Sequence, residues 1–276
     1  MSISALRHDQ LSPRLPGATA PLREGQEADF DLVARLDPRE TAFFFDVDGT
    51  LIDIAPHPDA VEVPAPLTAH LDRLASLSGG ALALVSGREA AVLDHLFAPL
   101  SLSLSGVHGA QMRRSPQGEV ESPTAAMDAG VRMQLRDLAA RLGLHAEDKG
   151  WSVALHYRDR PSVAADLEEA IARILAGHAR TLTVLPGRMV FEVKNRGHDK
   201  GAAVRAFMAE APFAGRSPVF FGDDVTDEAG FAAVRELGGL AVSVGRRLPG
   251  ADAVLADAEM VRALVRHLVQ SAEGRA

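Results

Sequence analysis

The 276-residue chain contains no cysteine, a single tryptophan and a single tyrosine. The absence of cysteine excludes disulfide bonds, thiol catalysis and zinc fingers. No apolar run approaches the ~20 residues that a membrane-spanning helix needs. The first residues, MSISALRHDQLSPRLPG, lack the apolar centre of a secretion signal. We therefore expect a soluble cytoplasmic protein without a membrane partner.

Long basic runs are also absent. The chain has 29 Lys and Arg against 37 Asp and Glu, a formal net charge of -8. Proteins that bind a nucleic-acid backbone concentrate basic side chains on one surface, so nucleic acid is not an expected partner. Apolar residues are abundant: they make up 47% of the chain, enough for one large domain or two modest ones with a buried core.

The N-terminal segment of the chain shows no hydrophobic periodicity. Residues 1–30 are rich in Pro, Gly, Ala and charge without periodicity, which predicts a flexible tail. From Thr41 onward, short apolar runs alternate with amphipathic helical patterns. This alternation predicts an α/β fold with a parallel sheet covered by helices on both faces. The predicted strands are AFFFDV, GALALVS, LSLSG, SPVFFGD and LAVSVG.

The middle of the chain has a different pattern. WSVALHYR and MVFEVKN alternate in hydrophobicity like strands with one wet face, and helical patterns cover residues 124–142 and 162–178. These features predict a small α+β domain inserted into the larger fold. We expect the core to comprise residues 31–113 and 188–276, and the inserted domain to comprise residues 114–187.

Polar side chains follow three of the predicted strands, at the edge where an open parallel sheet binds ligands. Asp46 follows the first strand, Ser86 the second, and the acidic segment GDDVTDE follows SPVFF. So many acids cannot all be ionised without a cation, and oxygen ligands select a hard ion such as Mg²⁺. The predicted metal ligands are Asp46, Asp48, Asp223 and Asp224. Asp224 and Asp227 have helix capping as an alternative role.

These groups suit metal-assisted phosphoryl transfer. Asp46 can attack phosphorus, and Asp48 can protonate the leaving alcohol and then activate water. Around these two acids, Thr50, Ser86 and Lys200 can bind the phosphoryl oxygens. A calcium-binding EF-hand loop is disfavoured, because the glycine of DVDG comes too early for one. A strand end followed by a tight turn is the structural alternative for that segment alone.

In this order, DVDGT, SGR, Lys200 and GDDVTDE resemble the signature segments of the haloacid dehalogenase superfamily of phosphatases. The resemblance implies a Rossmann-like core, Mg²⁺ as cofactor and an aspartyl-phosphate intermediate on Asp46. It also implies a metal bound by Asp46, Asp223 and the backbone carbonyl of Asp48. SGVHGAQMR, WSVALHYR, FEVKNRGHDKG and GDDVTDEAGF further resemble the trehalose-6-phosphate phosphatase family, over residues 42–245. That narrower resemblance implies trehalose 6-phosphate as substrate and an inserted α/β cap.

Sugar hydroxyls bind charged and amide groups that lose solvent when a site closes. Glu192 and Lys194 alternate along FEVKN and can point together at a ligand. Gln111 stands where the family often has Glu, and Asn195 where it often has Pro. The candidate sugar-binding residues are Arg88, His108, Gln111, Arg113, Glu192 and Lys194. Weaker candidates, which a solvated strand face would also explain, are Lys149, His156 and Arg158.

Two other functions are compatible with these residues. One is a related sugar phosphatase that acts on sucrose phosphate or mannosyl phosphoglycerate. The other is a catalytically silent partner of a trehalose-phosphate synthase. A silent partner has no chemical need of Asp46, Asp48 and Lys200 together, so the leading prediction is an active phosphatase, with the synthase as a further candidate partner.

Overall fold

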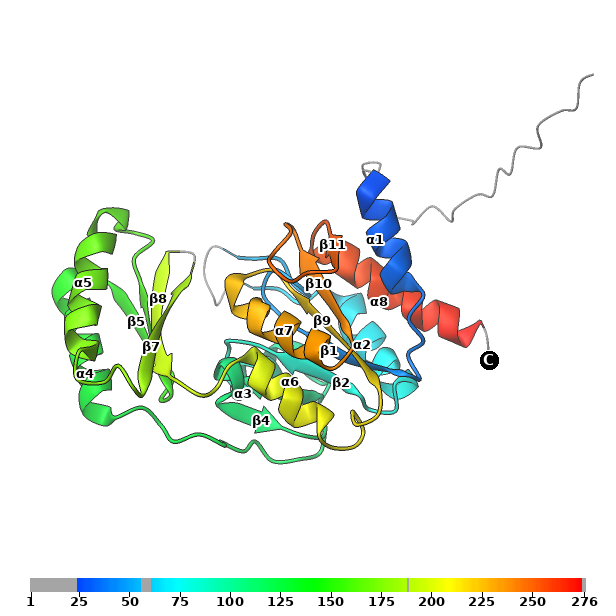
Figure 1. Cartoon of the computed structure of the whole chain (residues 1–276), viewed down its shortest axis with the longest axis horizontal. Coiled ribbons are helices and arrows are strands. Elements are labelled where there is room, and N and C mark those ends of the chain that lie inside the picture. The colour runs from blue at the N-terminus through cyan, green and yellow to red at the C-terminus, as the bar shows by residue number, and fades with distance from the viewer. Residues whose placement is uncertain (1–23, 56–60, 188, 275–276) are drawn as a thin grey trace, which may run out of the picture.

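The computed structural model describes residues 24–55, 61–187 and 189–274. It consists of two lobes that lie side by side, each built on its own sheet (Figure 1). The larger lobe contains a seven-stranded sheet. From one edge to the other, its strands are β11 (Ala253–Leu255), β10 (Leu240–Val244), β9 (Ser217–Gly222), β1 (Thr41–Phe45), β2 (Leu82–Val85), β3 (Ser103–Gly106) and β4 (Gln111–Arg113).

All neighbouring strands of this sheet are parallel except β3 and β4, which pair antiparallel. The strand β1 lies at the centre because all five of its residues, TAFFF, are buried. Phe43 and Phe45 pack into the core on one face of the sheet and Phe44 packs into the core on the other. Each buried phenylalanine contributes about 1.5–3 kcal/mol, so the strand that ends at Asp46 is held from both sides.

Helices cover both faces of the large sheet, as predicted. The helices α2 (Ala65–Leu77), α3 (Ala90–Phe97) and α8 (Ala258–Glu273) contribute to the core that contains Phe43 and Phe45. The helices α6 (Lys200–Met208) and α7 (Glu228–Glu236) contribute to the core that contains Phe44. The predicted α/β fold class, a Rossmann-like core with an inserted domain, is confirmed.

The helix α1 (Glu24–Ala34) corrects the expectation of a flexible tail over residues 1–30. Residues 1–23 lie outside the described part of the chain. The segment from Glu24 onward folds because Phe30 and Val33, one turn apart, are buried in the same core as α8. The ring of Phe30 also lies edge-on to that of His267, with centroids 6.0 Å apart.

The smaller lobe is an antiparallel sheet with two helices. Its strands, from edge to edge, are β5 (His145–Asp148), β6 (Ser152–His156), β8 (Val190–Asn195) and β7 (Leu182–Gly187). The helices α4 (Ala129–Leu142) and α5 (Ala164–Leu175) pack against it around a separate apolar core. The N-terminus of α4 is capped by Asp128, whose side chain accepts a hydrogen bond from the backbone of Val131.

The strand β8 corrects one boundary drawn from the sequence. The sequence pattern places it in the core, as part of residues 188–276, yet it pairs antiparallel with β6 and β7 along its whole length. The smaller sheet therefore continues to Asn195, because the alternating run FEVKN supplies its second inner strand. Across the described segments, the helices are all too short or too polar to span a membrane.

Candidate active site

Two neighbouring strands bring the acids together. Asp46 directly follows β1 and Asp223 directly follows β9, and these strands pair in register with Phe45 opposite Phe221. Asp227 ends the short helix η4 (Val225–Asp227) and is fully buried. One carboxylate oxygen each of Asp46, Asp223 and Asp227 lies within 4.8 Å of the others.

Lys200 neutralises part of this charge. Its ammonium lies 2.7 Å from Asp46 Oδ1 and donates a hydrogen bond of 2.6 Å to Asp227 Oδ1. Burial disfavours the charged lysine, but Asp227 and Asp46 outweigh it and hold the pKa of Lys200 above its usual range. Burial raises the pKa of Asp46, and together with the Asp227 charge it raises the pKa of Asp223 to about 6.

The acids fit a metal ion. Oδ1 of Asp223 and the hydroxyl of Thr50 are both buried, and neither has a hydrogen-bond partner among the described residues. Gly49 has φ +80°, and a side chain there would collide with the Asp223 carboxylate. Several carboxylates together, one of them with a buried oxygen that lacks a hydrogen-bond partner in the described chain, provide the oxygen ligands that a hard cation prefers. The cluster of Asp46, Asp223 and Asp227 could therefore hold a metal ion.

Asp227, rather than the predicted Asp224, joins Asp46 and Asp223 in the acid cluster. Asp227 Oδ2 accepts hydrogen bonds of 3.0 Å from the backbone N–H groups of Asp223 and Asp224. Asp224 caps η4 instead, since its Oδ1 accepts from the backbone of Val225 at 2.8 Å. Because Asp227 in turn accepts from the Asp224 backbone, the two acids form a reciprocal capping box, and the predicted alternative of capping describes both of them.

The side chain of Asp48 pairs with Arg88 and is not part of this cluster. Arg88 Nε donates to Asp48 Oδ2 and Arg88 Nη2 donates to Asp48 Oδ1, both at 2.7 Å. The loop that carries Arg88 is fixed by Ser86, whose Oγ accepts from the Arg88 backbone at 3.1 Å. A general-acid role for Asp48 requires the Arg88 fork to open, because both carboxylate oxygens are engaged.

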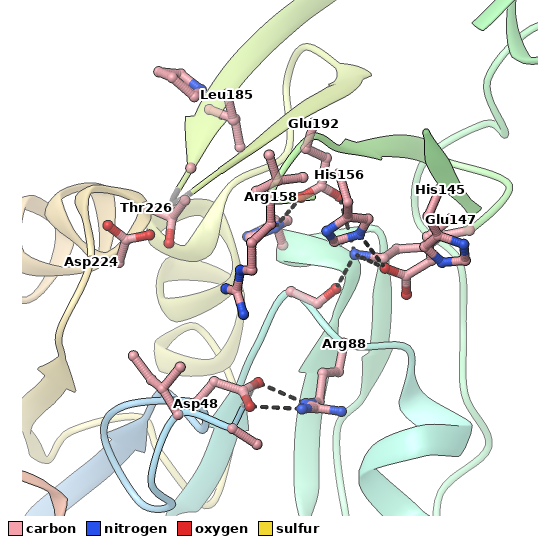
Figure 2. Close-up of a pocket in the computed structure, with 18 of the residues that line it drawn as sticks. Asp48, Arg88, His145, Glu147, His156, Arg158, Leu185, Glu192, Asp224 and Thr226 are labelled. Atoms are coloured by element: carbon pink, nitrogen blue, oxygen red, sulfur yellow. Dashed lines mark hydrogen bonds and ion pairs between the residues drawn. The ribbon is translucent and has the colours of Figure 1, made fainter. Parts of the chain in front are cut away.

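A cavity of about 440 Å³, here called the main cavity, lies between the two lobes. The larger lobe contributes Asp48, Arg88 and His108 to its lining. The smaller lobe contributes His145, Glu147, Lys149, His156, Arg158 and Glu192. Figure 2 shows Arg158 reaching from the smaller lobe toward the Asp48–Arg88 pair. The volume suits one small polar molecule with several hydroxyl groups.

Glu192 joins the two lobes at the centre of this cavity. Its carboxylate lies 3.1 Å from His108 Nε2 and 3.4 Å from Lys149 Nζ, and accepts a hydrogen bond of 2.6 Å from Ser152. Lys149 also donates to the backbone oxygen of Gly87 at 3.1 Å. Burial alone would raise the pKa of Glu192, but His108, Lys149 and Ser152 hold it well below its usual range. Glu192 is therefore ionised at neutral pH.

His108 occupies an unusual backbone position. Its φ of 52° lies in the left-handed region, as does the φ of 47° at Val107. Non-glycine residues hold such conformations at a cost and do so most often at functional sites. Burial lowers the pKa of His108, so the imidazole is neutral and can donate through Nε2 to Glu192.

Two of the predicted sugar-binding residues are engaged inside the core. Gln111 Oε1 accepts a hydrogen bond of 2.8 Å from the backbone of Ala90. Arg113 binds both oxygens of Asp94, at 2.9 and 2.7 Å, and the backbone oxygen of Leu102. These partners lie on α3 and its neighbours, and no pattern in the sequence reveals them. A third candidate, Lys194, lines a neighbouring cavity rather than the main one.

Sequence reasoning missed three charged or imidazole residues of the main cavity, Asp159 and the pair His145 and Glu147. The pair lies on β5, whose residues are at least partly exposed, so the strand has no apolar alternation. A signal does exist in the segment HAEDK, where His145, Glu147 and Lys149 alternate and therefore share a face.

The fold and the arrangement of these acids resemble those of the haloacid dehalogenase superfamily of phosphatases. The Bacteroides thetaiotaomicron phosphatase of that superfamily superposes with a TM-score of 0.57 at 16% identity, covering 85% of this chain and 97% of its own, a likeness of fold alone. The chain belongs more narrowly to the trehalose-phosphatase family, whose sequence model matches residues 44–257. Members of this family are phosphoric monoester hydrolases, so the resemblance seen in the sequence is confirmed.

Individual relatives agree with this assignment. "Probable trehalose-phosphate phosphatase" of Sinorhizobium fredii is 40% identical over 245 residues, which cover 87% of this chain and 92% of the relative. "Trehalose-6-phosphate phosphatase" of Escherichia coli is 46% identical over 208 residues, which cover 74% and 77%. In fold alone, the C-terminal domain of C. albicans trehalose-6-phosphate phosphatase is also similar: it superposes with a TM-score of 0.77 at 23% identity, covering 88% of this chain and 97% of that domain.

Proposed function

We propose that this protein hydrolyses trehalose 6-phosphate to trehalose and inorganic phosphate, in the cytoplasm and with Mg²⁺ as cofactor. The observation that carries the proposal is the Asp46 carboxylate at the end of the central strand. It lies 2.7 Å from the Lys200 ammonium and beside Asp223, which has an unpartnered oxygen. A nucleophile, a fixed positive charge and a metal-binding acid thus meet at one sheet edge. The names of the two sequence relatives support the substrate.

The reaction takes two steps on the same phosphorus atom. A carboxylate oxygen of Asp46 bonds to phosphorus while the bond from phosphorus to the sugar oxygen breaks. Asp48 gives its proton to that oxygen, and trehalose leaves. Asp48 then takes a proton from water, whose oxygen attacks phosphorus and frees both Asp46 and inorganic phosphate. Thr50 and Ser86 donate hydrogen bonds to the phosphoryl oxygens during both steps.

Asp46 and Asp223 would hold Mg²⁺, and Asp227 keeps the loop of Asp223 in place. The ion supplies positive charge that offsets the negative charge of the phosphoryl group and of the acids. We expect EDTA to abolish phosphate release and excess Mg²⁺ to restore it, and Mg²⁺ to raise the melting temperature by linkage. Full turnover in excess EDTA would contradict the proposed role of the acid cluster.

The sugar would bind in the main cavity. Glu192, His108 and Arg88 line it with charged and imidazole groups, and Lys149 adds an ammonium. These groups match the hydroxyls of a disaccharide, and Glu192 links both lobes around them. The enzyme that would supply the substrate is a trehalose-phosphate synthase. We extend the proposal to that enzyme as a partner, which co-elution of the two proteins on size-exclusion chromatography would test.

The function is tested by phosphate release from a panel of substrates. We expect trehalose 6-phosphate to react with a higher kcat/KM than sucrose 6-phosphate, glucose 6-phosphate or mannosyl phosphoglycerate. Asp46→Asn should lower turnover by at least about 10³-fold, since it removes the nucleophile while keeping the shape of the side chain. Circular dichroism controls for folding. Preference for another sugar phosphate would overturn the substrate, and turnover by Asp46→Asn would overturn the mechanism.

A further inference from the structure

A second cavity, of about 290 Å³, lies next to the main one and shares His108, Leu185 and Thr226 with it. It adjoins the side of the main cavity where Figure 2 labels Leu185 and Thr226. The polar groups particular to this second cavity are Thr183, Lys194, Arg196, His198, Asp199 and Lys200. Most of them lie on the segment that leads from β8 to α6. The proposed phosphatase mechanism uses Lys200 alone among them.

Lys194 is a buried cation in this cavity, where the nearby charges of Asp199 and Glu192 offset only part of the cost of its burial. It is 4% exposed, and its ammonium donates a hydrogen bond to the backbone oxygen of His198. Within the described residues, no carboxylate forms an ion pair with it, whereas Lys200 has two. A buried ammonium without an anion is costly, and burial accordingly lowers the pKa of Lys194. A bound anion would remove that cost.

His198 adds a second unsatisfied group. The residue is 3% exposed, and neither of its ring nitrogens has a hydrogen-bond partner among the described residues. Nδ1 of His108, in the shared wall, is equally unpartnered within that part of the chain. Buried imidazole nitrogens almost always have a partner. Water could satisfy an imidazole, but it would not balance the charge of Lys194.

The remaining charges make the cavity positive. Arg196 donates through Nε to the backbone oxygens of Ala179 and Leu182, and within the described residues it has no carboxylate partner. Asp199 is the one acid that lines the cavity, and its Oδ1 accepts from the backbone of Ala202 at the start of α6. Two basic side chains thus face one acid that is already engaged.

We propose that the second cavity binds a small oxyanion of the phosphate class, at a site that adjoins the catalytic one and shares Lys200 with it. Ammonium, guanidinium, imidazole and hydroxyl donors surround a volume that suits a small ligand, and several donors around one anion are the pattern of phosphate recognition. The anion would bridge the lobes, because Thr183 and Lys194 belong to the smaller sheet while Lys200 and Ala229 belong to the larger lobe. Its source is either free phosphate, such as the released product, or the phosphate group of a monoester.

The proposal is tested by calorimetric titration of inorganic phosphate into the full chain in EDTA. Without a metal, the uncompensated acids around Asp46 repel phosphate from the catalytic site, so the second cavity dominates the signal. We expect Lys194→Met and His198→Phe each to weaken binding by at least about tenfold. Arg180→Met, which changes an exposed arginine outside the cavity, should bind like the wild type. Testing two cavity variants keeps the result interpretable if one of them misfolds.

The position of the anion is checked by soaking crystals in tungstate. Tungsten beside Lys194 and His198 supports the site, and tungsten only beside Asp46 and Lys200 overturns it. A parallel titration with glucose 6-phosphate separates the sources. Binding of phosphate alone supports a product site, and binding of the monoester supports a metabolite site. Failure of both ligands to bind, or equal binding by wild type and both cavity variants, overturns the proposal. These readouts involve no turnover, so they are independent of the proposed hydrolysis.

Discussion

Lys200 sets the charge balance of the catalytic site. It is 2% exposed and is the one cation that contacts the acid cluster in the described chain, where it lies against Asp46 and Asp227. A buried ion pair gives little net stability, but the loss of one partner leaves an uncompensated charge. The fold thus depends on Lys200 even before any substrate arrives.

We predict that Lys200→Met destabilises the protein by about 3–5 kcal/mol at pH 7. The acids that Lys200 now balances would be left to repel one another, and Mg²⁺ should recover part of the loss. Urea unfolding gives the change in free energy. The matched control is Arg205→Met, which breaks the exposed pair with Glu236 and should cost less than about 1 kcal/mol. Equal costs for the two variants would contradict the buried-charge account.

His198 makes a separate prediction about pH. Burial and the nearby charge of Lys194 lower its pKa to about 4, against a usual value of 6.5. Between these two values the unfolded chain binds more protons, so stability falls as the pH falls through this window. We expect His198→Phe to lose less stability than the wild type between pH 7 and pH 4. The difference should be about 1 kcal/mol, discounted because the imidazole faces a cavity.

The melting temperatures of the two proteins at both pH values check this prediction. Phosphate in the second cavity should narrow the difference, because an anion favours the protonated imidazole. If wild type and His198→Phe lose the same amount of stability between pH 7 and pH 4, groups other than His198 control the pH dependence in this range.

The strand β8 connects substrate recognition to the rest of the site. Its alternation puts Glu192 and Lys194 two residues apart, yet Glu192 lines the main cavity and Lys194 the second one. Each residue of the pair therefore belongs to a different ligand environment. The strand leads directly into the segment that ends at Lys200, so the two cavities and the catalytic lysine share one stretch of chain.

We predict that Glu192→Ala lowers turnover of trehalose 6-phosphate by at least about tenfold, the loss expected for one unpaired polar contact of about 1.4 kcal/mol. Turnover of para-nitrophenyl phosphate, which does not fill the sugar cavity, should change much less. Glu169→Ala, at an exposed glutamate of α5, serves as the matched control. Equal losses on both substrates would show that Glu192 supports the fold or the core chemistry.

The sequence predicts those elements whose residues carry their own signal. The strands β1, β2 and β9 of the large sheet contain apolar runs, and Asp46, Ser86 and Asp223 follow them at positions that topology alone brings together. The short strands β4, with the sequence QMR, and β11 carry no such signal, and the sequence does not predict them. The antiparallel placement of β8 could not be predicted, because pairing with β6 and β7 is a long-range contact. The engagement of Arg113 by Asp94 is equally non-local. Asp227 is the fully buried acid of the cluster. Its burial could not be predicted, because its sequence position is equally typical of a helix cap.

The molecule as a whole contains separate apolar cores. The core of the smaller lobe is formed by α4, α5 and their sheet, and shares no residue with the cores of the larger lobe. Regions with separate cores can unfold in separate steps. Trp151, the only tryptophan, lies in the smaller lobe, where its indole donates to the backbone oxygen of Thr124.

We therefore predict two unfolding transitions in urea. Trp151 fluorescence should report the smaller lobe and change at lower urea than the far-ultraviolet circular dichroism, which is dominated by the helices of the larger lobe. Mg²⁺ with a non-hydrolysable trehalose phosphate analogue should bring the transitions together, because a ligand between the lobes stabilises both. Coincident transitions in the free protein would show that the lobes unfold as one unit.

The helices α1 and α8 pack together at the end of the larger lobe that lies farthest from the smaller lobe (Figure 1). The main cavity lies between the lobes, so substrate enters well away from these helices. A bead, a surface or a second enzyme joined at Glu24 or Gly274 would lie at the end of the larger lobe that is remote from the main cavity (Figure 1). The protein can thus be immobilised in a flow reactor, or fused in tandem with an enzyme that makes its substrate, with the attachment remote from the main cavity.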